Sequence, residues 1–311
     1  MKQTTFFFLV VCLVNILNVV QAFDFKYPRS TVEMDLKKVS EHVYFVQGAT
    51  GVATDNQGFI SNATVIVSSE SITIIDALGS PALAEQLLSK IRGLSQLPIL
   101  RVITTHYHAD HIYGLQVFEE QGAEIFAPAG VSEYLNSPAA QDRLEERRFS
   151  LEPWVNEETR LVQPDSLIDK PIVIKDGGVT LMINYLGKAH SDADLTVFVE
   201  PDNVFITGDV IFEGRIPFVG DSDSRAWLET LNKMAKKEGI EALIPGHGGL
   251  AREPLKAISL TRDYLSFLRQ NFSAGVEEMM SFDEIYKSID WSEFENLPAF
   301  DLGNRVNAYQ V

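Results

Sequence analysis

A cluster of three histidines and one aspartate constrains this chain more than any other feature: His106, His108, Asp110 and His111. The cluster directly follows the run Leu100 to Ile103, which is typical of a buried strand, so its side chains emerge where that strand ends. In extended chain, His106 and His108 point the same way and can bind one metal ion. Asp110 and His111 lie beyond a turn and are displaced enough to bind a second. Imidazole and carboxylate ligands favour zinc.

Three further potential ligands occupy similar positions. His190 and His247 each lie in a loop that follows an expected strand and contains glycine, which lets the backbone bend so that an imidazole reaches inward. Asp209, in Thr207-Gly208-Asp209, also follows a strand, and its carboxylate could bridge two cations. The sequence therefore predicts a metal site made from well-separated segments.

The order of elements predicts an α/β fold. Runs of β-branched and aromatic residues predict strands at 43–46, 63–67, 72–75 and 100–103, with a helix at 80–94 before the last of them. The second half predicts strands at 172–174, 179–185, 195–199 and 204–207, a helix at 224–237 and a strand at 242–244. Two similar β-rich halves, each closed by helices, predict a four-layer αββα sandwich. The polar stretch 136–160 between them is expected to be a helix and a surface loop bordering the active-site mouth.

The chain divides into three segments. Residues 1–22 are expected to be a cleaved signal peptide, because Lys2 precedes an apolar run that is shorter than the roughly 20 residues needed to span a bilayer. Val20-Gln21-Ala22 is a suitable cleavage site for signal peptidase. Residues 38–250 form the expected domain that carries the metal site. Residues 251–311 form a C-terminal helical extension, with helices expected at 255–272 and 282–289. The sequence assigns no role to residues 305–309.

These motifs resemble those of the metallo-β-lactamase superfamily. The resemblance covers residues 38–250 and depends on HxHxDH, a later histidine, Gly-Asp and Pro-Gly-His-Gly. It implies a first metal site made by His106, His108 and His190, and a second made by Asp110, His111 and His247. It also implies that Asp209 bridges the two ions or binds the second.

Two zinc ions at such a site predict hydrolysis. A metal pair can hold hydroxide near neutral pH while polarising a carbonyl, so the expected nucleophile is metal hydroxide. Asp110 is the expected catalytic side chain, which orients the nucleophile and passes a proton to the leaving group. The predicted substrate is an ester, thioester, lactone or β-lactam in a small molecule.

The particular hydrolase stays open. The likeness to class B β-lactamases extends around Asp209, but the best-known of those enzymes have cysteine there. They also have a lysine that binds the antibiotic's carboxylate where this chain has Phe212, and Arg215 is a candidate substitute for that lysine. The stretch 214–221 is more similar to periplasmic zinc metallohydrolases encoded alongside quinoprotein dehydrogenase or sulfur-oxidation systems.

Three alternatives to this hydrolase are therefore kept. They are a class B β-lactamase, a sulfur dioxygenase of the same fold with a single iron, and a binding protein that has the hydrolase fold but has lost its activity. Members that have lost activity usually lack metal ligands, and this chain keeps seven.

The composition of the chain limits the cellular compartment and the binding partners that can be expected. Cleavage of residues 1–22 removes Lys2 and no acidic residue, which takes the formal net charge from −17 to −18, and such a surface repels nucleic acid. The one cysteine, Cys12, leaves with the signal peptide, so the mature chain has no disulfide and suits an oxidising compartment. We expect a secreted, most simply periplasmic, protein with a small-molecule substrate and no membrane contact after cleavage. Its oligomeric state is not predicted.

Four other polar side chains are candidates for a role at or near the site. His42 is expected to be structural. Asp76 either orients a ligand imidazole or caps a turn. Asp192 and Asp194 are expected to cap the loop after His190 rather than to orient a ligand.

Overall fold

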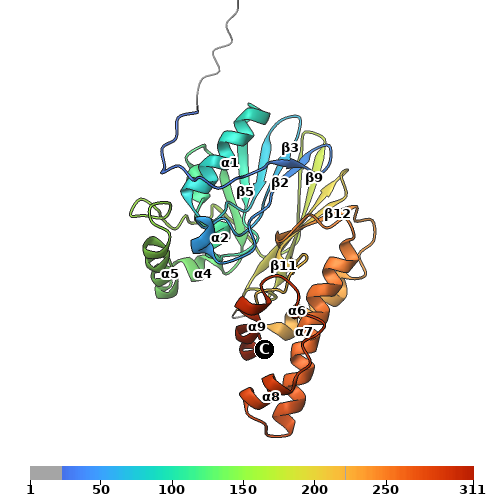
Figure 1. The fold of residues 1–311 in the computed structure, drawn as a ribbon. Coiled ribbons are helices and arrows are strands. Elements are labelled where there is room, and N and C mark those ends of the chain that lie inside the picture. Colours follow the sequence, from blue (N-terminus) through green and yellow to red (C-terminus); the bar gives the residue numbers. More distant parts are fainter. Residues whose placement is uncertain (1–22, 221) are drawn as a thin grey trace, which may run out of the picture.

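The computed structural model describes residues 23–220 and 222–311, and in it the chain forms two β-sheets packed face to face with helices outside (Figure 1). Sheet A has the strand order β1-β2-β3-β4-β5-β6-β7 and sheet B the order β12-β11-β10-β9-β8. The strands of sheet A are β1 Lys37–Lys38, β2 Val43–Val46, β3 Ala63–Val67, β4 Ile72–Ile75, β5 Ile99–Ile103, β6 Glu124–Pro128 and β7 Ser166–Ile168. Those of sheet B are β8 Ile172–Asp176, β9 Val179–Gly187, β10 Asp194–Glu200, β11 Val204–Phe212 and β12 Ala242–His247.

The helices belong to the outer layers and to the connections between strands. They are α1 Pro81–Leu94, α2 Ala109–Ile112, α3 Leu115–Glu119, α4 Val131–Leu135, α5 Pro138–Ser150, α6 Ser224–Met234, α7 Pro254–Glu277, α8 Phe282–Ser288 and α9 Phe300–Gln310, with a 3₁₀ turn at Ala53–Asn56. No helix in the described ranges is both long and apolar enough to cross a membrane. The expected signal peptide, residues 1–22, lies outside the described residues.

The alternation of side chains between the two faces of each strand explains the layered architecture. In β4, Ile74 packs with α1 in the outer core of sheet A, whereas Ile75 belongs to the core between the sheets. In sheet B, Leu243 packs toward α6 and α7, and Ile244 packs toward sheet A. Since successive side chains of a strand point to opposite faces, each strand of this kind joins two cores. The predicted four-layer αββα sandwich is confirmed.

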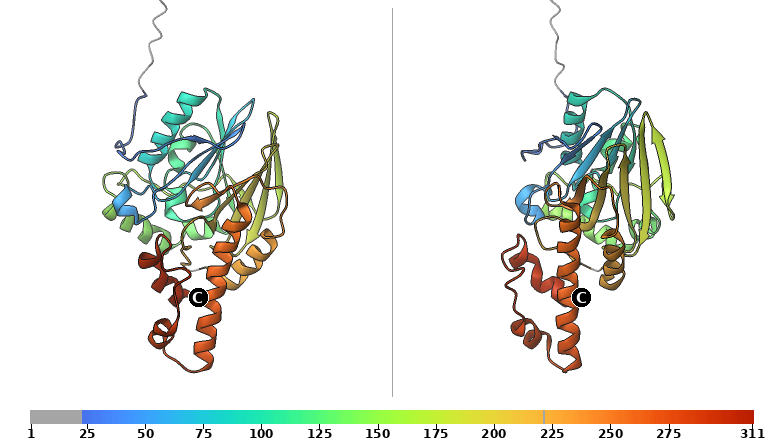
Figure 2. Two further views of the ribbon diagram at one scale, coloured as in Figure 1. Left: turned by 45° about the vertical axis from the view of Figure 1, so that its right-hand side comes forward. Right: turned by 90° about the vertical axis from the view of Figure 1, so that its right-hand side faces the viewer.

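The C-terminal extension is helical, as predicted, and contains one helix more than expected. Helix α7 packs beside α6 and β11, and its far end projects beyond the sheets together with α8 (Figure 2). Helix α9, which the sequence did not predict, turns back toward the body of the protein. Strands β6 and β7 were also missed. The expected helix at 224–237 ends at Met234, and the stretch 136–160 contains α5 followed by irregular chain.

Candidate metal centre

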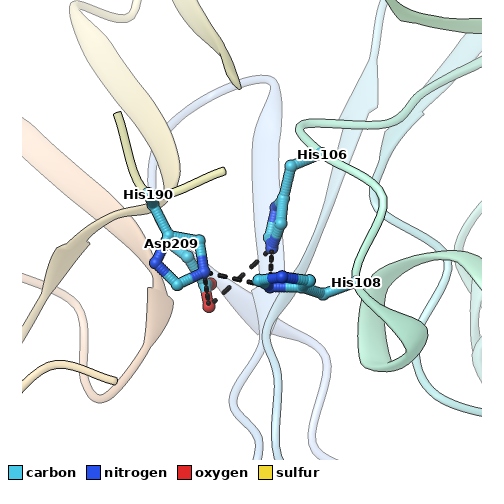
Figure 3. A group of neighbouring side chains, drawn as sticks. All are labelled: His106, His108, His190 and Asp209. Carbon is cyan, nitrogen blue, oxygen red and sulfur yellow. Dashed lines mark hydrogen bonds and ion pairs between the residues drawn. The ribbon is translucent and has the colours of Figure 1, made fainter. Parts of the chain in front are cut away.

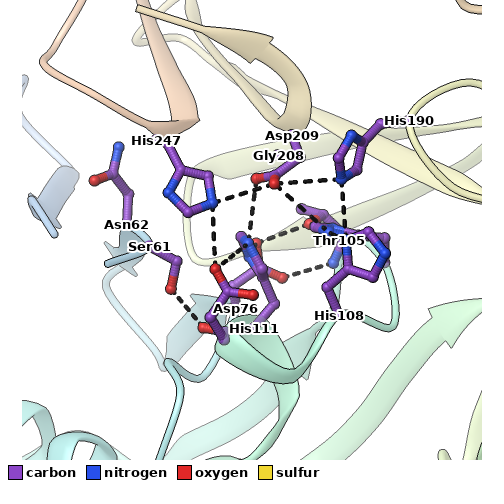
Figure 4. A network of polar contacts seen from close by, with 12 residues as sticks. Ser61, Asn62, Asp76, Thr105, His108, His111, His190, Gly208, Asp209 and His247 are labelled. Carbon is purple, nitrogen blue, oxygen red and sulfur yellow. Dashed lines mark hydrogen bonds and ion pairs between the residues drawn. The ribbon is translucent and has the colours of Figure 1, made fainter. Parts of the chain in front are cut away.

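The seven predicted ligands converge at one end of the sandwich, although they come from five segments (Figure 4). The β5–α2 connection carries the first two, α2 carries two more, and the β9–β10 loop, β11 and the end of β12 carry one each. They form two adjacent groups: His106, His108, His190 and Asp209 in the first, and Asp110, His111 and His247 in the second. Six of the seven residues are grouped as the resemblance implied, whereas Asp209, which was expected to bridge the two ions or to bind the second, is grouped with the first.

The first group brings three imidazoles around one point (Figure 3). Nδ1 of His108 lies 3.0 Å from Nε2 of His106 and 3.0 Å from Nε2 of His190. Oδ2 of Asp209 lies 3.4 Å from Nε2 of His190. Neutral imidazole has a single N–H, so three converging ring nitrogens cannot satisfy one another with hydrogen bonds alone. Their lone pairs suit a shared cation.

The second group lies on the other side of Asp209. Oδ2 of Asp110 is 3.2 Å from Nε2 of His247 and 3.6 Å from Nε2 of His111. Oδ1 of Asp209 is 3.2 Å from Nε2 of His111, yet neither of these two buried atoms has a hydrogen-bond partner. Buried polar atoms are rarely left unpaired, so an oxygen and a nitrogen in this condition fit a metal ion that both would bind. Asp209 thus faces both groups, as a bridging ligand would.

Hydrogen bonds behind the ligands fix which ring nitrogen faces the centre. Nδ1 of His111 donates to Asp76 at 2.9 Å, and Nδ1 of His106 donates to the hydroxyl of Thr105 at 3.0 Å. That hydroxyl donates in turn to Asp76 at 2.8 Å. Nδ1 of His247 donates to the carbonyl of Ile60 at 2.7 Å. The Nε2 lone pairs of these three histidines are therefore left to face a metal. Asp76 has the orienting role.

Burial and mutual charge set the pKa values of the ligands. Burial lowers the pKa of His190 to about 3 and that of His106 well below its usual range. Burial also opposes protonation of His247, but the carboxylates of Asp209 and Asp110 raise its pKa to about 9. Burial would raise the pKa of Asp209, yet His247 and His111 hold it well below its ordinary value. His106 and His190 are therefore neutral imidazoles. At His247 and His111 the carboxylates favour a positive charge, which a bound metal ion would supply in place of the ring protons.

A cavity of about 670 Å³ opens above the centre. His108, Asp110, Asp209 and His247 line it, which places the ligands within reach of a small molecule. The other side chains that line it come from several elements: Val52, Ala53, Thr54, Ile60, Tyr107, Tyr134, Ala139, Arg143, Arg147, Phe212, Arg215, Phe218 and Gln310.

One wall of the cavity is aromatic and another is cationic. The rings of Tyr107 and Tyr134 stack with centroids 4.2 Å apart. Arg143 and Arg147 project from α5, which confirms that the stretch 136–160 borders the mouth, and Glu146 lies between them. In a protein with a strongly negative net charge, these cations favour an anionic ligand at this place.

Arg215, the predicted substrate contact, does line the cavity. Its guanidinium lies over the ring of Phe212 at 5.6 Å, and Nε donates to the carbonyl of Ile216 at 3.2 Å. It forms no ion pair with any carboxylate in the described part of the chain. Burial lowers its pKa, although Asp209 and Asp110 act in the opposite sense. Phe212 itself is buried and stacks flat on His247, with ring centroids 5.3 Å apart.

The remaining candidates lie outside the centre. His42 forms an ion pair with Asp202 at 2.7 Å. Asp192 lies on the surface, paired with Lys188 at 3.1 Å. Asp194 accepts the N–H of Ser191 at 2.8 Å and so caps the loop after His190.

Sequence reasoning missed the residues that support and cover the centre. Thr105, the carbonyl of Ile60 and the amide of Asn62 act through hydrogen bonds whose partners are distant in sequence, and no motif marks them. The tyrosine pair gave no signal either, because its members come from different elements. Gln310, near the end of the chain, was assigned no role.

A pair of adjacent metal-binding groups at one end of an αββα sandwich defines the class to which this protein belongs, that of metal-dependent hydrolases. The sequence model of the metallo-beta-lactamase superfamily matches residues 56–247. The chain therefore belongs to the metallo-beta-lactamase superfamily, as its motifs indicated, and is a hydrolytic enzyme.

Two curated relatives differ in the activity that their names state. The chain is 23% identical to metallo-beta-lactamase IND-1 of Chryseobacterium indologenes over 251 residues, which cover 79% of this chain and 92% of that protein. It is 27% identical to acyl-coenzyme A thioesterase MBLAC2 of Gallus gallus over 202 residues, which cover 60% and 72%. Among solved structures, a metallo-beta-lactamase from Pontibacter korlensis shares the fold with a TM-score of 0.61 and 17% identity, covering 75% of this chain and 99% of that one.

Proposed function

We propose that the protein is a binuclear zinc hydrolase that cleaves an ester, thioester, lactone or lactam bond in a small, anionic molecule. The observation that carries the proposal is the convergence of seven donor side chains into two groups on either side of Asp209. Bound zinc would supply activated water and polarise the scissile carbonyl.

The chain's own residues account for the other requirements. Asp110 faces the cavity with 21% of its side chain exposed, so its carboxylate can orient water and carry a proton to the leaving group. Arg215 has no carboxylate partner among the described residues and can bind an anionic group of the substrate. The stacked tyrosines offer an apolar surface to the rest of the molecule.

A β-lactamase is the second candidate, supported by the likeness to the Chryseobacterium indologenes enzyme. In this chain, however, the position where lactamases place a carboxylate-binding lysine holds Phe212, which packs against His247 and has no charge. An anionic antibiotic would have to be bound by Arg215 instead. We therefore propose β-lactam cleavage only as a secondary activity.

Metal analysis and a panel of substrates test the proposal. We expect two zinc ions per chain, with loss of hydrolysis on chelation and recovery when zinc is returned. A p-nitrophenyl ester, a thioester, a lactone, a carbapenem and a cephalosporin should be compared. One iron per chain would contradict the proposal and favour a dioxygenase, and turnover of lactams alone would favour the second candidate.

A matched pair of variants ties hydrolysis to the centre. Asp110→Asn should lower kcat/KM by at least about 100-fold, because an amide cannot carry the proton. Asp192→Asn is the control, since Asp192 is a surface aspartate beside another ligand, His190, and contacts Lys188 instead of the centre. Equal activity of the two variants would remove Asp110 from the mechanism.

A further inference from the structure

Helix α9, at the end of the chain, touches the active-site loop that carries Arg215. This loop, residues 214–220, follows β11 and begins and ends with glycines whose φ angles are positive, Gly214 at 66° and Gly220 at 55°. It places Arg215 and Phe218 in the cavity wall. Since such backbone angles suit glycine and few other residues, the loop is set off from the strand before it and depends on contacts elsewhere for its position.

Asn307 of α9 supplies two of those contacts. Its side chain is fully buried, its Oδ1 accepts the N–H of Val219 at 2.9 Å, and its Nδ2 donates to the carbonyl of Pro217 at 2.7 Å. A third bond joins the N–H of Ile216 to the carbonyl of Pro298, just before α9, at 3.2 Å. Both ends of one amide thus hold the backbone of the loop.

The side-chain amide of Asn307 is itself held in place by a residue of α7. Nδ2 of Asn307 also donates to the hydroxyl of Tyr264 at 3.1 Å, and that hydroxyl donates to Oδ1 of Asn304 at 2.8 Å. Nδ2 of Asn304 donates to the hydroxyl of Tyr286 at 2.9 Å. These buried groups form one connected chain of hydrogen bonds from α8 through α7 and α9 to the loop. A buried network of this kind defines a single geometry when every member is satisfied.

We infer that Asn307 is a positioning residue of the substrate pocket and that the C-terminal extension forms part of that pocket. By fixing the 214–220 loop, Asn307 sets where Arg215 meets an anionic substrate, while Gln310 of the same helix reaches the cavity directly. The inference rests on the proposed function for the role of Arg215. The contact between α9 and the loop is independent of it.

Asn304 provides the matched control for the test. Both asparagines lie on α9, both are buried and both bond to the hydroxyl of Tyr264, but only Asn307 touches the loop. The zinc-loaded full chain, its Asn307→Ala, Asn304→Ala and Arg215→Ala variants should be assayed with p-nitrophenyl hemisuccinate, which is anionic, and p-nitrophenyl butyrate, which is neutral.

We expect Asn307→Ala to raise KM for the hemisuccinate about tenfold, in the same direction as Arg215→Ala, with kcat changed less than about threefold. KM for the butyrate and the zinc content should stay near those of the unmodified protein. Asn304→Ala removes no bond to the loop but loosens the network behind Asn307, so it should lower the melting temperature and raise KM for the hemisuccinate less than about threefold. Equal KM values in the two asparagine variants would overturn the inference.

Hydrogen–deuterium exchange gives a readout that needs no turnover. Asn307→Ala should raise deuterium uptake in peptides covering 214–220, because the N–H of Val219 loses its acceptor. Asn304→Ala leaves that acceptor in place and should raise the uptake much less. Asn307→Ser, which keeps a hydroxyl for one of the two backbone groups, should give an intermediate uptake and retains the test if the alanine variant does not fold. If neither ester is cleaved but uptake differs as expected, the proposed substrate class fails and the positioning role stands. Deuterium uptake that is the same in all variants would contradict the positioning role of Asn307.

Discussion

At the scale of single residues, the centre depends on the space that a glycine leaves beside Asp209. A Cβ on Gly246 would lie 1.8 Å from Oδ1 of Asp209 and 2.8 Å from its backbone nitrogen. The sequence predicted that glycines around His247 bend the backbone, but φ at Gly246 is not in the left-handed region. What the site requires of Gly246 is the absence of a side chain, which lets the carboxylate of Asp209 approach β12.

Gly246→Ala should therefore displace Asp209 and lower zinc binding from two ions per chain to one at most. The carboxylate cannot move without leaving histidines of both groups, because Oδ1 lies 3.2 Å from Nε2 of His111 and Oδ2 lies 3.4 Å from that of His190 and 3.2 Å from that of His247. Metal content after gel filtration, with the melting temperature in excess zinc, measures the effect.

Gly249→Ala is the control for this variant. Gly249 lies in the loop that follows β12, three residues after Gly246, and an added Cβ there would meet only Nε2 of Gln47, at 4.0 Å. We expect two zinc ions and a nearly unchanged melting temperature. If Gly246→Ala also binds two, the close approach does not determine the geometry of the site.

The ligand residues could be predicted from the sequence, whereas the residues that hydrogen-bond to them could not. His106, His108, Asp110 and His111 are close in sequence, and metal chemistry limits which residue types can serve. Thr105 and Asp76 act through hydrogen bonds that many polar residues can make, so their roles follow only from the three-dimensional arrangement. Asp76 could be raised as one of two alternatives because it ends a strand beside the cluster.

At the scale of elements, the loop after β12 is held by the residue that precedes β3. Nδ2 of the buried Asn62 donates to the carbonyls of Pro245 and Gly248 at 2.8 and 3.0 Å, and its Oδ1 accepts the N–H of Gly48 at 3.0 Å. These bonds connect the segment before β3 of sheet A to the end of β12, which carries His247. They fix the second group of ligands from the opposite sheet.

Asn62→Ala should lower the free energy of unfolding by about 2 to 3 kcal/mol, since it removes three side-chain hydrogen bonds and leaves buried backbone groups unpaired. Urea denaturation of the chelated protein measures this without a contribution from zinc. Asn136→Ala removes an exposed side chain and should change the free energy by less than about 0.5 kcal/mol. Equal effects would mean that Asn62 does not connect the sheets.

The elements that sequence analysis missed lack the pattern on which it depends. Strand β7 has three residues, which is too short for alternation to be seen, and β6 ends at Pro128. The buried residues of α9 are Asn304, Asn307 and Ala308, so the helix turns polar side chains inward and has no apolar stripe. Longer elements with apolar faces gave a clearer signal: α1 was predicted close to its observed bounds, and the start of α7 was predicted within one residue, although α7 continues to Glu277 and not 272.

At the scale of the whole molecule, an ion pair joins the two sheets away from the metal centre. Nη1 of Arg101 in β5 lies 2.6 Å from Oδ2 of Asp176 at the end of β8. Ser71, just before β4, also donates to Asp176, whereas the centre lies beyond the other end of β4, at Asp76. The side chains of Arg101 and Asp176 are 17% and 8% exposed, so water screens their attraction only partly.

This ion pair predicts how stability depends on pH. Burial opposes ionisation of Asp176, but the bonds from Ser71 and Arg101 outweigh it and lower the pKa of the carboxyl. A lowered pKa stabilises the fold fully above the unfolded value, about 4, and this contribution is lost as pH falls through the folded value. Asp176→Asn should therefore cost about 2 kcal/mol at pH 7, and the difference from the unmodified protein should shrink below pH 4. Urea denaturation of the chelated proteins at pH 7 and pH 3.5 checks this, with the exposed Asp192→Asn as the control. A difference that stays constant over this range would show that packing, and not the charge of Asp176, joins the sheets at this point.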